Sequence, residues 1–164
     1  MVAHSAAIIG TFTTQRDAAM TPGSRPSKFW INWLLVASAG VAAFGLLLVV
    51  APAFTRRGFS MLVYASPGDI DSFGAEQVRY ISLVHAVLGG VMVGWGTALF
   101  HVARSLLAGG VSAGWRIIAV SVVAWFVPDT AYSLLSGFWQ NALLNAAFFA
   151  LFAVPLWATR DLRR

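Results

Sequence analysis

Four long apolar runs, almost free of formal charge, constrain the fold of this chain more than any other feature. The runs extend over Phe29 to Thr55, Tyr80 to Ala103, Ile117 to Ser136 and Phe138 to Thr159, and their only formal charge is Asp129. An α-helix needs roughly 20 apolar residues to cross about 30 Å of hydrocarbon. The runs lack the alternation of apolar and polar residues that is typical of membrane β-strands. The sequence therefore predicts an all-α, integral membrane four-helix bundle.

The predicted organisation is a single membrane domain with two short flanking segments. Residues 1–28 form a flexible leader, in which Met20 is an alternative start, residues 29–160 form the four-span domain, and residues 161–164 form a basic tail. The spans are expected at about residues 30–54, 79–104, 114–136 and 138–159. The pair Ser136-Gly137 is a helix-stop signal. The third and fourth spans are therefore expected to form an antiparallel hairpin.

Composition supports a membrane protein and excludes several other classes. The chain is 59% hydrophobic and only 10% charged, whereas soluble domains contain about 25% charged residues. Its net charge of +5 does not indicate nucleic-acid binding, because the basic residues gather at span ends and form no patch with interleaved aromatic residues. Cysteine is absent, which excludes thiol redox chemistry, thiolate metal sites and disulfides.

The distribution of Lys and Arg predicts the orientation in the membrane. Eight basic residues lie on the side of the two termini: Arg16, Arg25, Lys28, Arg104, Arg116, Arg160, Arg163 and Arg164. Three lie on the other side: Arg56, Arg57 and Arg79. Basic residues are enriched in cytoplasmic segments. We therefore expect a multi-pass protein of the bacterial cytoplasmic (inner) membrane with both termini in the cytoplasm.

Small residues recur every four positions in two of the spans. They are Ala86, Gly90, Gly94 and Ala98 in the second span and Ala142, Ala146 and Ala150 in the fourth. Such stripes let helix backbones approach closely in lipid. We expect them to pack within the bundle, and docking of a membrane protein partner is the alternative.

Asp129 is the residue that apolar helix packing does not explain. It follows Pro128, whose ring cannot donate a hydrogen bond to the carbonyl of Ala124 and tends to kink the helix. Helical spacing puts Asp129 on a polar and aromatic stripe, which comprises Ser121, Trp125, Asp129, Tyr132, Ser133 and Ser136. A charge at this depth costs a few kcal/mol and generally faces the bundle interior. The stripe is therefore expected to face protein or water.

Depth along the helices predicts the partners of Asp129. At 1.5 Å per residue, His85 in the second span and Asn141 and Asn145 in the fourth lie at a similar level below the outer surface. We expect these polar groups to form an outward-facing pocket lined by Trp125, Tyr132 and Trp139, with Ser133 and Arg79 nearby. The first span offers only apolar residues at this level and forms a wall.

Three functions are compatible with this constellation. In the first, the pocket binds a small or lipid-like molecule or relays protons between Asp129 and His85. In the second, the same residues are a polar clamp in a structural or accessory subunit. The third is an enzyme with Asp129 and His85 as an acid–base pair. It is the least supported, because the sequence contains no Gly-rich phosphate loop, GxSxG or HExxH motif. No cofactor is predicted, and one Asp, one His and two amides are a poor transition-metal set.

Two segments resemble the DoxX-like group of small bacterial four-span membrane proteins. They are "EQVRYISLVHAVLGGVMVGWG" at Glu76 to Gly96 and "AWFVPDTAYSLLSGFWQNALLN" at Ala124 to Asn145. The likeness covers roughly residues 29–159. It implies a four-helix membrane bundle and a loose link to redox or respiratory contexts. The lack of cysteine argues against a thiol-linked version of that role.

Overall fold

The computed structural model describes residues 26–163, and residues 1–25, with the alternative start at Met20, lie outside it together with Arg164. The described chain is all-α, as predicted. Five α-helices follow in order: α1 (Lys28–Val50), α2 (Pro52–Tyr64), α3 (Ala75–Val102), α4 (Ser112–Leu135) and α5 (Trp139–Ala158). Three short helical segments accompany them: η1 (Asp69–Ser72), the π-helical η2 (Ala103–Leu107) and η3 (Arg160–Arg163).

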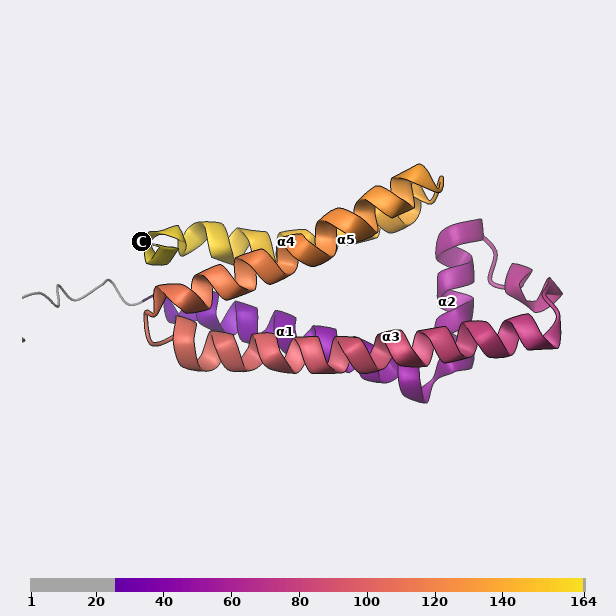
Figure 1. Ribbon diagram of the computed structural model, residues 1–164, viewed down its shortest axis with the longest axis horizontal. Coiled ribbons are helices and arrows are strands. Elements are labelled where there is room, and N and C mark those ends of the chain that lie inside the picture. The colour runs from indigo at the N-terminus through magenta and orange to yellow at the C-terminus, as the bar shows by residue number, and fades with distance from the viewer. Residues whose placement is uncertain (1–25, 164) are drawn as a thin grey trace, which may run out of the picture.

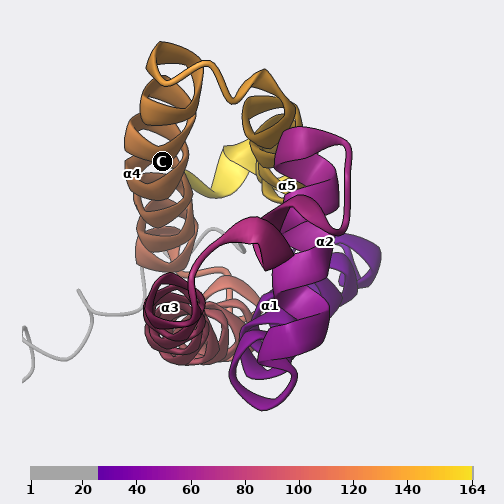
Figure 2. The same ribbon diagram turned by 90° about the vertical axis from the view of Figure 1, so that its right-hand side faces the viewer.

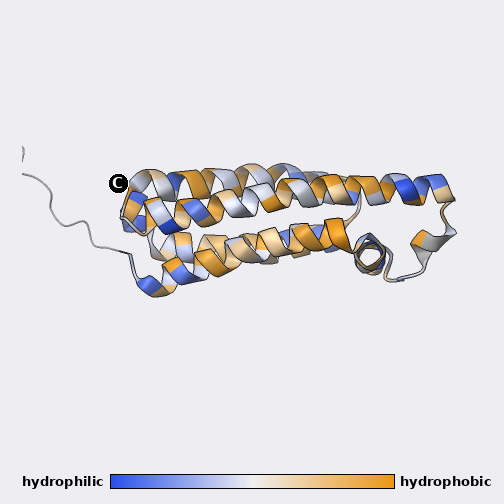
Figure 3. Ribbon diagram, turned by 90° about the horizontal axis from the view of Figure 1, so that it is seen from below, coloured by the Kyte–Doolittle hydropathy of each residue, from blue (hydrophilic) through white to orange (hydrophobic). Residues whose placement is uncertain are grey.

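Four of these helices are long and apolar enough to span a membrane: Lys28–Val50, Ala75–Leu107, Ser112–Leu135 and Trp139–Ala158. They run up and down in turn, so that the start of α1 and the C-terminal end lie at the same end of the bundle (Figure 1). Apolar residues run along the helices, and hydrophilic residues gather mainly toward the helix ends (Figure 3). The fold is that of a multi-pass helical membrane protein.

The first span ends at Val50, earlier than predicted, because Pro52 begins a separate helix. A residue before proline is disfavoured in the helical region, and Ala51 leaves it with φ −130° and ψ 56°. Helix α2 then crosses the ends of α1 and α3 (Figures 1 and 2). Its Thr55 and Ser60 are buried, while Phe54 and Met61 are exposed. The exposed face of α2 thus carries the charged Arg57 as well as these apolar residues.

Helix α1 packs mainly against α3, and glycine is required where they touch. A Cβ at Gly45 would lie 2.6 Å from the carbonyl oxygen of Gly89, and one at Gly96 would lie 2.6 Å from the backbone nitrogen of Ala42. Real side chains do not approach so closely, so any larger residue would push the helices apart.

The small-residue stripe of α3 does not make this contact. Gly90, Gly94 and Ala98 are exposed, and a Cβ at Gly90 or Gly94 would meet nothing within 4 Å. The expectation that this stripe packs within the bundle was wrong for these three residues, whereas Ala86 is half-buried. The residues that pack are Gly89 and Gly96, which are spaced by seven and lie on the adjacent face of the helix.

Two tryptophans attach α5 to the other helices through backbone carbonyls. Pro155 lies inside α5 and cannot donate a helical hydrogen bond to the carbonyl of Leu151. The indole nitrogen of Trp33 donates to this carbonyl oxygen at 2.9 Å. The indole nitrogen of Trp115 donates to the carbonyl oxygen of Leu156 at 2.9 Å, in the last turn of the helix. Both indoles therefore satisfy acceptors that the helix itself leaves open.

The buried apolar core lies in the half of the bundle near the termini. Its residues are Ile31, Leu34, Val41, Leu99, Ala103, Leu107, Ile118, Val122, Phe152, Leu156 and Leu162. Toward the other end, the α4–α5 pair diverges from α3, and α2 stands beside the opening (Figures 1 and 2). The half of the bundle that is not filled by the core contains the cavity described next.

Candidate functional site

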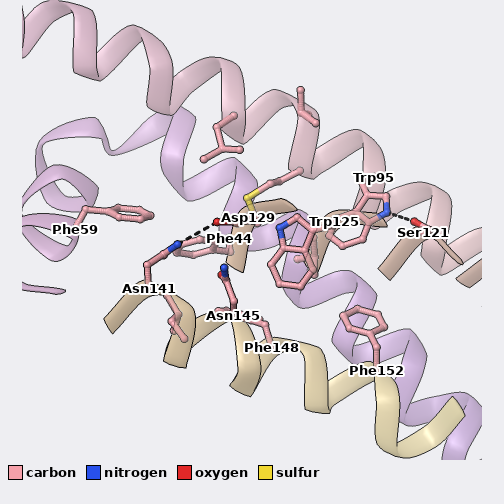
Figure 4. A pocket seen from close by; sticks show the side chains of 15 residues that line it. Phe44, Phe59, Trp95, Ser121, Trp125, Asp129, Asn141, Asn145, Phe148 and Phe152 are labelled. Carbon is pink, nitrogen blue, oxygen red and sulfur yellow. Dashed lines mark hydrogen bonds between the residues drawn. The ribbon is translucent and has the colours of Figure 1, made fainter. Parts of the chain in front are cut away.

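A cavity of about 440 Å³ lies between the α1–α3 pair and the α4–α5 pair. All five helices contribute to its wall (Figure 4). Fifteen residues line it: Val41, Phe44, Phe59, Leu88, Val91, Met92, Trp95, Ser121, Trp125, Asp129, Asn141, Leu144, Asn145, Phe148 and Phe152. Most of the lining is aliphatic or aromatic. The polar groups are therefore few, and their positions decide what the cavity can recognise.

Asp129, Ser133 and Asn141 form a polar cluster in the wall of the cavity. The Asn141 side-chain nitrogen donates to the Asp129 carboxylate at 3.1 Å and to the Ser133 hydroxyl oxygen at 2.8 Å. The Ser133 hydroxyl donates to the Asp129 backbone carbonyl at 2.7 Å. Asp129 and Ser133 are four residues apart on α4, and Asn141 begins the facing turn of α5. The hairpin thus brings the three side chains together.

Asn145 lies one turn further along α5 and is 4% exposed. Its side-chain nitrogen donates to the hydroxyl oxygen of Thr130 on α4 at 3.4 Å. All of these side-chain bonds join α4 or α5 residues to one another. The cluster therefore also links the two helices of the hairpin, as a polar clamp would.

The deep end of the cavity is aromatic. The Trp95 indole nitrogen donates to the Ser121 hydroxyl oxygen at 2.5 Å. The ring centroid of Trp95 lies 5.7 Å from that of Trp125 and 6.4 Å from that of Phe152. Figure 4 shows the Trp125 indole between this group and Asp129. Because the Trp95 nitrogen is satisfied by Ser121, the Trp95 and Phe152 rings present apolar faces and edges to the cavity.

The structure brings four of the predicted site residues to the cavity and leaves others away from it. Asp129, Asn141, Asn145 and Trp125 line the cavity, and Ser133 is hydrogen-bonded to this group.

The remaining predicted site residues lie elsewhere. Tyr132 is 71% exposed, and Arg79 pairs with Glu76 at 3.2 Å on the exposed start of α3. Trp139 is exposed. Pro128 is exposed on α4, which continues through it to Leu135.

His85 faces α2 and is not among the residues that line the cavity. Its ring makes an edge-to-face contact with Phe59, with centroids 5.0 Å apart, and its Nδ1 lies 2.7 Å from the carbonyl oxygen of Ile81. The sequence places His85 at a similar depth to Asp129, but depth does not determine the direction in which a side chain points. Helix α2 occupies the space beside His85.

Several lining residues were not singled out from the sequence as site residues. Phe44, Phe59, Phe148 and Trp95 come from four different helices. Scattered phenylalanines in spans are generally in contact with lipid or core, so the sequence carries no signal that separates these from the others. Ser121 did lie on the predicted polar stripe of α4, and its partner Trp95 could not be inferred from spacing within one helix.

Among the side chains that the structure describes, no group of three His, Cys, Asp or Glu residues could hold a metal ion. Compared with family models, curated proteins and solved structures, the chain matches none. The geometry and chemistry of the cavity are therefore the observations on which a function is proposed.

Proposed function

We propose that this protein binds a small or lipid-like amphipathic molecule in the cavity between its two helix pairs. The observation that carries the proposal is a cavity of about 440 Å³ with a mostly apolar lining and a cluster of polar side chains on one wall. Binding sites for small molecules are typically pockets of about 300–1,000 Å³ with such a lining. The apolar walls favour an apolar body, and Asp129, Asn141 and Asn145 favour a polar head group.

Ligand binding is better supported than proton passage between Asp129 and His85. The Asp129 carboxylate contacts Ser133 and Asn141, whereas His85 packs against Phe59 of α2. A relay needs donor and acceptor within hydrogen-bonding distance or joined by water. Ligand binding requires only the groups that line the cavity.

We further propose that the cavity end of the bundle faces outward from the bacterial cytoplasmic membrane. Five basic residues of the described chain lie at the end of the bundle with the termini: Lys28, Arg104, Arg116, Arg160 and Arg163. Arg56, Arg57 and Arg79 lie at the other end. The excess supports cytoplasmic termini under the positive-inside rule.

Single-cysteine labelling tests this orientation. The chain contains no cysteine of its own, so only the introduced thiol reacts. Ser136→Cys lies in the α4–α5 turn and Val111→Cys in the connection before α4, and both positions are exposed. A membrane-impermeant maleimide should label Ser136→Cys in intact cells and Val111→Cys only after lysis. Labelling of Val111→Cys in intact cells would reverse the orientation.

Native mass spectrometry of the gently extracted protein tests the binding function. The expected result is a population that carries a discrete additional mass, which is reduced when Asp129 is replaced by Asn. Folded protein that carries no additional mass, in several mild detergents and after incubation with total membrane lipid, would contradict the proposal.

A purely structural role, as an accessory subunit of a membrane complex, is the second candidate. The hydrogen bonds from Asn141 and Asn145 to α4 favour it, because they join the two helices of the hairpin. In that case Asp129→Asn would lower stability and change no binding property. A kinship with the DoxX-like group stays a proposal that rests on the two segments quoted above.

A further inference from the structure

We propose that the ligand of the cavity is a lipophilic organic cation, an amine or an onium ion with apolar substituents, whose positive charge pairs with Asp129. The inference rests on the proposed binding function and adds the charge and chemical class of the ligand. It depends on three properties of the lining: its single charge, the neutral partners of that charge, and the aromatic rings around it.

Asp129 is the only charged residue among the fifteen described residues that line the cavity. Its carboxylate accepts from the Asn141 side-chain nitrogen at 3.1 Å, and the Ser133 hydroxyl, whose proton goes mainly to the Asp129 backbone carbonyl, lies 3.4 Å from it; both partners are neutral. No ion pair of Asp129 is found within residues 26–163. A carboxylate within a membrane span is costly unless it has a partner of opposite charge. The protein supplies the hydrogen bonds but no cation, so a bound cation would complete the pairing.

The orientation of the amides also favours a donor or cationic head group. Asn141 and Asn145 use their side-chain nitrogens in the hydrogen bonds to Asp129, Ser133 and Thr130. Their carbonyl oxygens therefore retain acceptor capacity. These oxygens and the carboxylate are the acceptors that the two asparagines and Asp129 can offer to a ligand. An anionic head group would be repelled here, and a neutral one would leave the carboxylate without a counter-charge.

The aromatic residues suit the substituents of such a cation. Phe44, Phe59, Trp95, Trp125, Phe148 and Phe152 line the cavity, and Trp125 is one helical turn from Asp129 on the same face of α4. Aromatic faces attract organic cations, and tryptophan does so most strongly. The same rings bury the apolar groups of the ligand. The positive charge of the ligand thus faces Asp129, and its apolar substituents contact the aromatic rings.

A hydrated inorganic cation fits the cavity poorly. Hard cations take six or more oxygen ligands, whereas the cavity offers a single carboxylate and no cluster of three acidic or histidine residues lies within the described chain. An ion that lost its water here would face mainly hydrocarbon. An organic cation carries its own apolar shell and avoids this cost.

A second apolar pocket of about 230 Å³ adjoins the first and offers a route from the membrane. The two pockets share Phe44, Phe59 and Leu144, and Phe54, Gly58 and Leu62 of α2 also line the second. Phe54 is exposed at the surface of α2, so in this proposal a lipophilic cation enters the second pocket past Phe54. An alkyl or aryl substituent can occupy it while the charge lies at Asp129.

Three probes of related shape test the inference on the full-length protein in a non-ionic detergent. They are tetraphenylphosphonium (a cation), tetraphenylborate (an anion) and triphenylphosphine oxide (neutral). Binding is measured by equilibrium dialysis, with the uptake of protein-free micelles subtracted. We expect the cation to bind the wild-type protein at least about tenfold more tightly than the neutral probe, and the anion to show no saturable binding.

Substitutions then identify the residue whose negative charge is responsible for binding the cation. Asp129→Asn is expected to lower the affinity for tetraphenylphosphonium by about tenfold or more and to leave that for the neutral probe unchanged. Asp161→Asn is the matched control, because it removes the same charge from an exposed residue of η3. It should change neither affinity.

The outcomes separate this inference from the binding function on which it rests. Equal saturable binding of the cation and the neutral probe to the wild-type protein would overturn the cation inference and leave the cavity as a binding site. No saturable binding of any probe would overturn both. Because the comparison of probes uses the wild-type protein, it holds even if Asp129→Asn does not fold.

Discussion

The Trp33 indole nitrogen donates a 2.9 Å hydrogen bond to the carbonyl oxygen of Leu151, across the contact between α1 and α5. This carbonyl is the one that Pro155, four residues later, cannot satisfy. The bond thus joins the first and last spans through an acceptor that exists because of a proline. It explains how α5 accommodates Pro155 without an open backbone group at this point.

Trp33→Phe should lower the free energy of unfolding by about 1–3 kcal/mol, because it leaves the Leu151 carbonyl without its donor. In a Pro155→Ala background the alanine N–H can satisfy that carbonyl, so the same change should cost less. Reversible unfolding in mixed micelles measures this double-mutant cycle. Trp139→Phe, at an exposed position, is the control. Equal costs of Trp33→Phe in both backgrounds would show that the two residues are not coupled.

Gly89→Ala and Gly90→Ala should have opposite effects although the residues are neighbours. A Cβ at Gly89 would lie 2.9 Å from the Cβ of Leu48, so overpacking should cost about 1–3 kcal/mol. A Cβ at Gly90 meets open space, and alanine should stabilise the helix by up to about 1 kcal/mol. The thermal midpoints of the two variants provide the comparison. A larger loss at Gly90 would mean that another face of α3 packs against α1.

Asn141→Leu should destabilise the α4–α5 hairpin by about 1–3 kcal/mol, because Asp129 and Ser133 lose a shared donor. Gln140→Met is a neighbouring control with a distinct expectation. The Gln140 side-chain oxygen is buried without a hydrogen-bond partner in the described structure, so its removal should be neutral or stabilising. Equal destabilisation by the two changes would argue against the clamp.

His85→Phe should leave the affinity for tetraphenylphosphonium within about twofold of the wild-type value, a change well below the 1.4 kcal/mol of a tenfold effect. The ring that replaces His85 can keep the edge contact with Phe59, and His85 does not line the cavity. The dialysis measurement described above gives the result. A tenfold loss would place His85 in the binding site after all.

Much of the architecture follows from local patterns in the sequence. The four apolar runs predict the spans because a helix satisfies its own backbone groups in lipid. The Ser136-Gly137 stop predicts the α4–α5 hairpin, and Gly137 takes the left-handed φ of 82° that such a turn uses. The proximity of Asp129 to Asn141 and Asn145 follows from that hairpin. Asn141 lies about one helical turn from the Gly137 tip, and Asp129 and Asn145 lie about two turns from it on the facing helices.

The errors concern the direction in which side chains point. The regular spacing of Gly90 and Gly94 suggested a packing face, yet Gly89 and Gly96 make the contact with α1. Small residues permit close approach on any face, and the position of the neighbouring helix decides which face is used. The same limitation affected His85, whose depth was inferred but whose direction depends on α2.

The sequence by itself determined the number of spans, their alternating direction and the isolation of Asp129 among apolar residues, because these depend on hydropathy and helical periodicity within each segment. Only the tertiary structure decided that α4 and α5 diverge from α3, that Phe59 of α2 reaches the resulting cavity, and that Asp129 has neutral partners there. These features depend on how the faces of different helices rotate and pack against one another, and no periodicity within a single helix contains that information.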